Sequence, residues 1–151
     1  TRRSSDLGAS VFVNQADYFE SANTILTDGV IKPTSCKDVL TQIDARSGTS
    51  TPLQLLQCLR VRCELNAVSN TGNGLTAQGC NYFAPYGNGI TGSANTVYGA
   101  EFSKGGFYDV TGITVTGTTG ECFVEDQAYT WSVISSNEGA FELGTNLAVI
   151  S

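Results

Sequence analysis

Five cysteines carry the most distinctive chemistry in this chain: Cys36, Cys58, Cys63, Cys80 and Cys122. Two of them bracket an alternating apolar and basic run in the stretch QCLRVRCELN. A thiol can act as a redox partner, a metal ligand, a nucleophile, half of a disulfide or a small buried apolar group. Spacing and neighbouring residues decide among these roles.

The spacing argues against metal and redox sites. The chain has no CxxC pair and no histidine, whereas zinc sites combine closely spaced Cys or His ligands and thioredoxin-like sites need CxxC. Cys58 and Cys63 are an odd number of residues apart, so on a strand they point to opposite faces. We therefore assign no metal and no cofactor, and we expect each of these two cysteines to contact a different partner.

Composition favours disulfides over buried free thiols. Five cysteines without any methionine, in a Thr-, Ser- and Gly-rich chain of low charge, are typical of an oxidising compartment. We predict two disulfides among Cys36, Cys58, Cys63 and Cys80, with Cys122 as the free thiol. The predicted location is extracytoplasmic: secreted, periplasmic or in an organelle lumen.

A nucleophilic role for Cys36 is the alternative. The sequence places it at the amino end of a predicted helix beside Lys37, where the helix dipole would lower the pKa of a thiol. No histidine is available as the partner base, so a structural role is favoured.

Acidic residues cluster late in the chain. A pair of carboxylates at the right separation could hydrolyse a glycoside, and a cluster could bind calcium. No EF-hand loop is present, and the interpretation is a solvated acidic rim with no assigned catalytic residue. The residues are Glu121, Glu125, Asp126, Glu138 and Glu142.

The aromatic segment NYFAPYGNG is the predicted contact surface. Aromatic side chains in a Gly- and Pro-containing loop are hard to bury, and loops carry much of the binding function of proteins. We predict that Tyr82, Phe83 and Tyr86 contact a partner.

Charge excludes one class of partner. The 151 residues carry a net charge of −6, and from Leu75 onward Lys104 is the single base. Nucleic acid binding needs a cationic surface, so we expect no nucleic acid partner. No apolar run is long enough to span a bilayer as a helix, so we expect no transmembrane segment.

Periodicity and capping residues predict an α+β fold. Apolar residues at helical spacing, together with capping residues such as Ser35 and Pro52, predict short amino-terminal helices. Strict alternation after Leu59 predicts a strand. The helices are expected at about 15–25, 35–47 and 52–59, packed on or capping an antiparallel sheet or small barrel formed by about 59–68 and 96–151.

The chain length fits one domain, 1–151, with 1–8 as a flexible amino-terminal arm. We find no repeat of fixed period.

These observations favour a non-catalytic structural or binding subunit of a larger extracytoplasmic assembly. Its expected partners are other protein subunits, with a glycan as the alternative. Two further functions stay open: a small β-barrel enzyme that uses carboxylate or tyrosine chemistry, with Asp109 or Glu125, on a sugar or small apolar metabolite, and a secreted adhesin or effector-like module.

Overall fold

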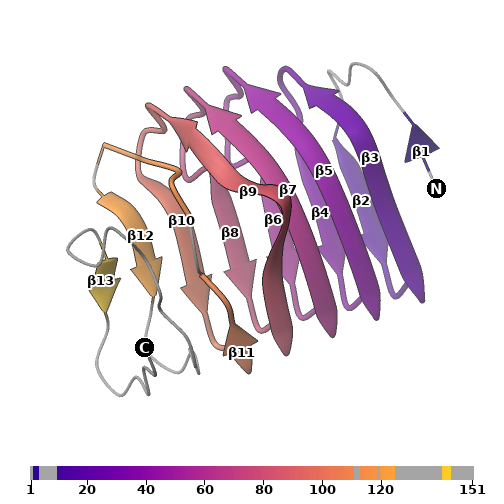
Figure 1. The fold of residues 1–151 in the computed structure, drawn as a ribbon. Helices are drawn as coiled ribbons and strands as arrows, with labels where there is room; N and C mark the ends of the chain where they lie inside the picture. The colour runs from indigo at the N-terminus through magenta and orange to yellow at the C-terminus, as the bar shows by residue number, and fades with distance from the viewer. Residues whose placement is uncertain (1, 4–9, 111–112, 119, 125–140, 144–151) are drawn as a thin grey trace.

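Successive coils of the chain build two parallel β-sheets (Figure 1). The computed structural model describes residues 2–3, 10–110, 113–118, 120–124 and 141–143. Sheet A contains β1 (Arg2–Arg3), β3 (Tyr18–Leu26), β5 (Asp38–Arg46), β7 (Arg60–Val68), β9 (Tyr82–Ser93) and β11 (Phe107–Tyr108). Sheet B contains β2 (Val11–Asn14), β4 (Ile31–Thr34), β6 (Leu53–Leu56), β8 (Leu75–Gln78), β10 (Tyr98–Ser103), β12 (Gly120–Val124) and β13 (Phe141–Leu143).

The chain alternates between the sheets, so strands two apart in sequence lie side by side and parallel. In-register partners such as Ile31, Leu53 and Leu75 are 22 residues apart. The described chain is therefore a β-solenoid with a 22-residue coil, and our conclusion that no fixed period exists was wrong. The next step is longer, because Leu75 pairs with Ala100.

The predicted α+β fold was wrong. No described residue lies in an α-helix, and the segments expected as helices at 15–25, 35–47 and 52–59 contain strands. In β5, Val39, Thr41, Ile43 and Ala45 point inward in strict alternation. Leu40, on the outer face, had completed a false helical stripe. Parallel neighbours on both sides supply the backbone hydrogen bonds, and this pairing overrides the local helical pattern.

The antiparallel sheet was wrong as well, although the strand expected near 59–68 is present as β7. The turn after β10 was read as a hairpin. Instead it carries the chain into the other sheet, and β11 pairs in parallel with β9. Of the predicted arm, Arg2–Arg3 pair with β3, and the remaining positions lie outside the described residues.

The corners that follow the short sheet B strands share one backbone conformation. One residue in each has a positive φ, including Ser35 (53°), Gln57 (54°) and Lys104 (50°). The corner N–H groups donate to the neighbouring coil and not within the turn: Ser35 N–H to Leu56 O (2.9 Å) and Gln57 N–H to Gln78 O (2.8 Å). The corners therefore join the coils as the strands do.

The residue after each positive φ lies on the inner side of the corner, where little space is available. These residues are Ala16, Cys36, Cys58, Cys80 and Gly105. A Cβ on Gly105 would collide with the Tyr108 ring, which occupies the corner space there. Three of the cysteines are therefore a stacked column of small corner residues, spaced 22 apart.

The predicted disulfides are absent among the described cysteines. Cys36, Cys58, Cys63 and Cys80 are buried free thiols. Burial raises the pKa of Cys63 to about 12, and it also raises the pKa of Cys36. Because Cys36 is buried in a corner and starts no helix, the nucleophile hypothesis is wrong too. The side chain of Cys122 lies outside the described part.

The space between the sheets is filled by apolar side chains and closed by polar corner residues. Phe83, Phe102 and Tyr108 are fully buried and pack together, with Phe83 and Phe102 ring centroids 5.1 Å apart. In the opposite corner, the buried Asn70 donates from Nδ2 to Asn95 Oδ1 (3.1 Å) and accepts from Gly48 N–H (3.0 Å). These bonds satisfy polar groups that burial would otherwise leave without partners.

Alkylation without reductant tests the thiol state. After denaturation of the native chain under non-reducing conditions, we expect peptides containing Cys36, Cys58, Cys63 and Cys80 to carry the label. The same reagent should leave them unlabelled in the folded state, because all four are buried. Recovery of any two of them as a disulfide-linked peptide would contradict this assignment.

Replacement of the corner asparagine should be costly. We expect Asn70→Ala to lower the free energy of unfolding by on the order of 3 kcal/mol, since the change leaves Gly48 N–H and Asn95 Oδ1 without their buried partner. The exposed Asn81→Ala is the matched control and should change it by less than about 0.5 kcal/mol. Chemical denaturation of both variants measures the difference, and equal stabilities would refute the role of this corner.

Candidate functional site

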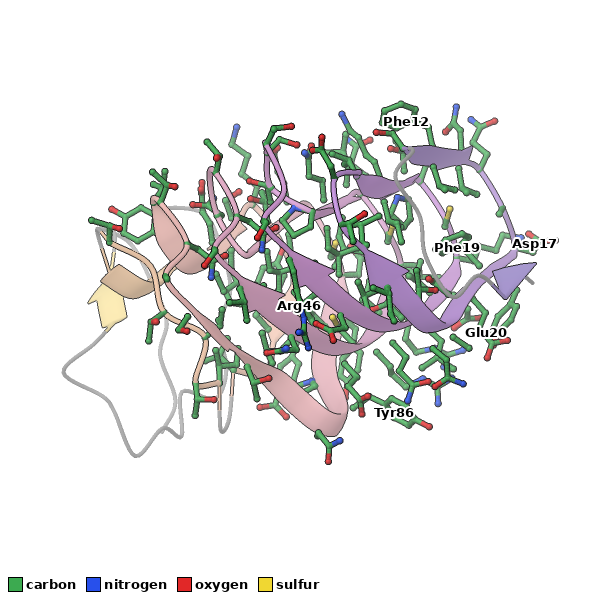
Figure 2. All side chains as sticks on the ribbon, turned by 90° about the horizontal axis from the view of Figure 1, so that it is seen from above. Phe12, Asp17, Phe19, Glu20, Arg46 and Tyr86 are labelled. Atoms are coloured by element: carbon green, nitrogen blue, oxygen red, sulfur yellow. The ribbon has the colours of Figure 1, made fainter. Side chains whose placement is uncertain are left out.

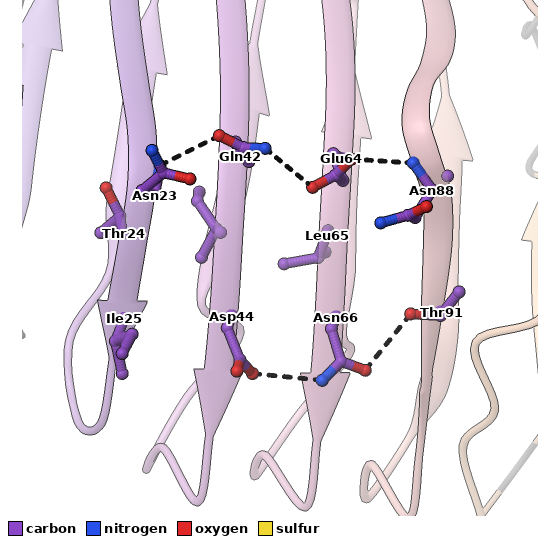
Figure 3. Close-up of a pocket in the computed structure, with 12 residues that line it drawn as sticks. Asn23, Thr24, Ile25, Gln42, Asp44, Glu64, Leu65, Asn66, Asn88 and Thr91 are labelled. Carbon is purple, nitrogen blue, oxygen red and sulfur yellow. Dashed lines mark hydrogen bonds between the residues drawn. The ribbon is translucent and has the colours of Figure 1, made fainter. Parts of the chain in front are cut away.

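The outer face of sheet A carries an open hollow of about 390 Å³. It lies across β3, β5, β7 and β9, and polar side chains from all four strands line it (Figure 3). Concave surfaces with convergent polar groups are the usual location of binding sites. This hollow is therefore the candidate site.

The first row of polar groups crosses the four strands. Asn23 N–H donates to Gln42 Oε1 (3.2 Å), and Gln42 Nε2 donates to Glu64 Oε1 (3.1 Å). Asn88 N–H donates to Glu64 Oε2 (2.7 Å). These bonds form one continuous chain from β3 to β9 (Figure 3).

The second row lies two residues further along the strands. Asn66 Nδ2 donates to Asp44 Oδ1 (3.1 Å), and Thr91 Oγ1 donates to Asn66 Oδ1 (3.2 Å). The guanidinium of Arg46 donates to both oxygens of Asp44, at 3.0 and 2.8 Å. These bonds with Arg46 hold the pKa of Asp44 below its usual range.

The rows follow from the coil. Glu64 stands one coil after Gln42, and Asn66 stands one coil after Asp44. Parallel strands lie roughly 4.8 Å apart, so outward side chains at equivalent positions line up along the solenoid axis. Two outward positions with polar residues thus become two parallel ladders.

An insertion in β9 borders the hollow. Cys63 pairs with Pro85 and Leu65 pairs with Ile90, so 86–89 all lie opposite the single residue Glu64. The resulting bulge brings the backbone of Gly87, at φ 57°, so close to Glu64 that a Cβ would collide with the carboxylate. Bulges of this kind redirect side chains next to binding and active sites.

The structure separates the three aromatic residues that we predicted as a contact surface. Tyr86 is 44% exposed within the bulge, on the outer side of sheet A, opposite Phe12 on the far side of the molecule (Figure 2). Tyr82 is 39% exposed on the same face, whereas Phe83 is fully buried between the sheets. We therefore keep Tyr82 and Tyr86 in the candidate surface and leave Phe83 out.

Our reasoning from the sequence missed the polar ladder itself. Gln42 and Glu64, like Asp44 and Asn66, are spaced 22 residues apart, as are the corner cysteines. A search for polar residues repeating at the cysteine spacing would have found them. Polar residues with half-buried side chains were read instead as the outer edges of unrelated elements.

The chemistry of this face favours binding over catalysis. The lowered pKa of Asp44 disfavours it as the proton-donating acid of a glycosidase, a role that needs a raised pKa. Within the described ranges, no three or more acidic or thiol side chains form a group that could hold a metal ion. Glu121, Glu125, Asp126, Glu138 and Glu142, the acidic cluster noted in the sequence, lie outside the described side chains.

Two glycines of the bulge offer a matched test of its geometry. Gly87→Ala and Gly89→Ala both place an alanine at positive φ, which costs about 1 kcal/mol. A Cβ at Gly89 meets open space, whereas one at Gly87 meets Glu64. We expect Gly87→Ala to be the more destabilising and to speed hydrogen exchange at the Asn88 amide. Identical melting temperatures and Asn88 exchange rates in the two variants would contradict this geometry.

The comparisons with known proteins add no relative. No protein-family model, curated protein or solved structure matches this chain. Among the described residues, no helix is long and apolar enough to cross a membrane.

Proposed function

We propose that the chain is a non-catalytic binding subunit whose sheet A outer face holds an extended, hydroxyl-rich polymer, most simply a polysaccharide. The observation that carries this proposal is the pair of hydrogen-bonded polar rows that cross four strands in one hollow. The partner is thus the glycan of our alternative prediction.

The bonding capacity of the rows supports a hydroxyl-rich ligand. A carboxylate has about four acceptor sites, and an amide side chain has two donors and two acceptor sites. Glu64 accepts two printed bonds, and Gln42 makes two through its side chain. Each retains capacity for a ligand, and sugar hydroxyls both donate and accept.

Preorganisation supports it as well. Each polar side chain of the rows is held by its neighbour one coil away, and each sits on a strand paired on both sides. Side chains already fixed by such contacts lose little rotational freedom on binding, which favours affinity. The repeat along the solenoid axis matches a ligand that is itself a repeating chain.

Exposed aromatic rings border the polar rows. Tyr86 lies in the bulge opposite Glu64, and Tyr82 lies at the beginning of the same strand. The face of a tyrosine ring can pack against the apolar face of a sugar, while the hydroxyl stays in water. Polar rows between such rings are a suitable surface for a glycan.

The assembly and the location remain part of the proposal. We propose an extracytoplasmic setting in which other subunits anchor the module while it contacts the polymer. Disulfides no longer support this setting, because Cys36, Cys58, Cys63 and Cys80 are free. The remaining support is the kind of ligand, since most extended polysaccharides are found outside the cytoplasm.

Binding to a panel of soluble neutral and acidic polysaccharides tests the function. We expect at least one to retard the chain in affinity electrophoresis and to give a measurable Kd by calorimetry. Asn66→Ala removes the central amide of the second row and should weaken binding by about tenfold, the equivalent of one lost hydrogen bond of roughly 1.4 kcal/mol.

The control is Gln54→Ala, which removes an outward amide from β6 in sheet B. It should bind as the unmodified chain does. Absence of binding to every polymer, or an equal loss in both variants, would refute the proposal. Circular dichroism of each variant confirms that the fold is retained.

A further inference from the structure

A second hollow, of about 600 Å³, lies on the same face of sheet A. Its lining residues are Arg60, Arg62 and Tyr82, with Arg60 and Tyr82 in register on neighbouring strands. Arg60, Arg62, Glu64 and Asn66 occupy successive outward positions of β7. The second hollow therefore continues the polar groove toward the beginning of the strands.

The two arginines of this hollow differ in their neighbours. Arg60 Nε lies 2.5 Å from Asp38 Oδ1, and this ion pair holds the pKa of Asp38 below its usual range. Arg62 is exposed, and it has no hydrogen-bond or ion-pair partner among the described residues. Its in-register neighbours, Leu40 and Ala84, offer no polar group.

The nearby acids are already engaged. Glu64, the next outward residue of β7, accepts hydrogen bonds from Gln42 and Asn88. Glu20 forms a side-chain hydrogen bond with Tyr18, which contributes to a raised pKa of Tyr18 after the effect of desolvation. The guanidinium of Arg62 thus presents its five donors to solvent without a carboxylate to neutralise it.

Tyr82 gives the hollow an aromatic wall. Its ring stacks on that of Phe107 one coil further, with centroids 5.4 Å apart and planes inclined by 7°. This contact fixes the orientation of the Tyr82 ring, which remains 39% exposed. A fixed ring beside a free guanidinium can pack against a sugar ring and leave its acidic substituent to the arginine.

We propose that this hollow binds the carboxylate of a uronic acid, so that the polymer is an acidic polysaccharide. The inference rests on the proposed function and names the substrate class of the same face. Arg62 binds the carboxylate through a bidentate pair, Tyr82 packs against the ring, and the two rows of the adjacent groove bind the hydroxyls of the following sugars.

Polygalacturonate and its methyl ester test the inference, because they share a backbone and differ in charge. We expect the acid to bind roughly tenfold or more tightly than the ester at low salt, and the preference to shrink as salt rises. Arg62→Gln should abolish the preference without changing affinity for the ester. Lys32→Gln, which removes one positive charge from the outer face of sheet B, should retain the preference.

The outcomes separate the two proposals. Equal binding of acid and ester, or an unchanged preference in Arg62→Gln, would overturn the uronic acid inference and leave the polysaccharide function standing. Failure of both polymers to bind would overturn the inference, and failure of the whole neutral and acidic panel would overturn the function. Binding of polyglutamate as tightly as polygalacturonate would assign an acidic peptide instead and also overturn the inference.

Discussion

The in-register stacking of coils at their corners is the constraint on which the rest of the structure depends. In an ordinary turn the backbone groups bond locally or to water, but here Ser35 and Gln57 donate to carbonyls of the next coil. That arrangement requires one residue at positive φ and a small residue inside the corner. For non-glycine residues a positive φ costs roughly 1–2 kcal/mol, which the bonds along the solenoid must offset. Ala16, Cys36, Cys58, Cys80 and Gly105 are the inner corner residues that satisfy the requirement of size.

Stacking turns each position of the coil into a column, and the candidate site is a consequence of this geometry. Gln42 and Glu64 are neighbours because they are equivalent positions of consecutive coils, and no loop is needed to bring them together. The coil changes length in β9, where 86–89 bulge opposite Glu64. The one interruption of register on the outer face of β7 and β9 therefore lies at the hollow, where it adds an exposed aromatic ring and a backbone donor to a flat ladder.

The failed predictions share a physical origin. Four-residue strands such as Ile31–Thr34 are too short to show a period of two, and Pro33 within that strand lacks the N–H that a central strand normally uses. Leu40 on the outer face made Asp38–Arg46 resemble a helix. The cysteine spacing of 22 was visible, but the cysteines were weighed as reactive groups and not as corner residues. Arg60–Val68 was predicted correctly, because its alternation is long and unbroken.

The sequence by itself determined several properties. The absence of histidine excludes imidazole chemistry, the alternation around Cys63 specifies a strand, and the Gly-rich segment around Tyr86 marks an irregular, exposed stretch. Only the tertiary structure decided that the strands are parallel, that the cysteines are corner residues, and that Arg62 stands without a partner beside Tyr82. The reason is that these features arise from pairing between residues 22 or more positions apart. The energy of such pairing belongs to the stack of coils and is not present in any local stretch of the chain.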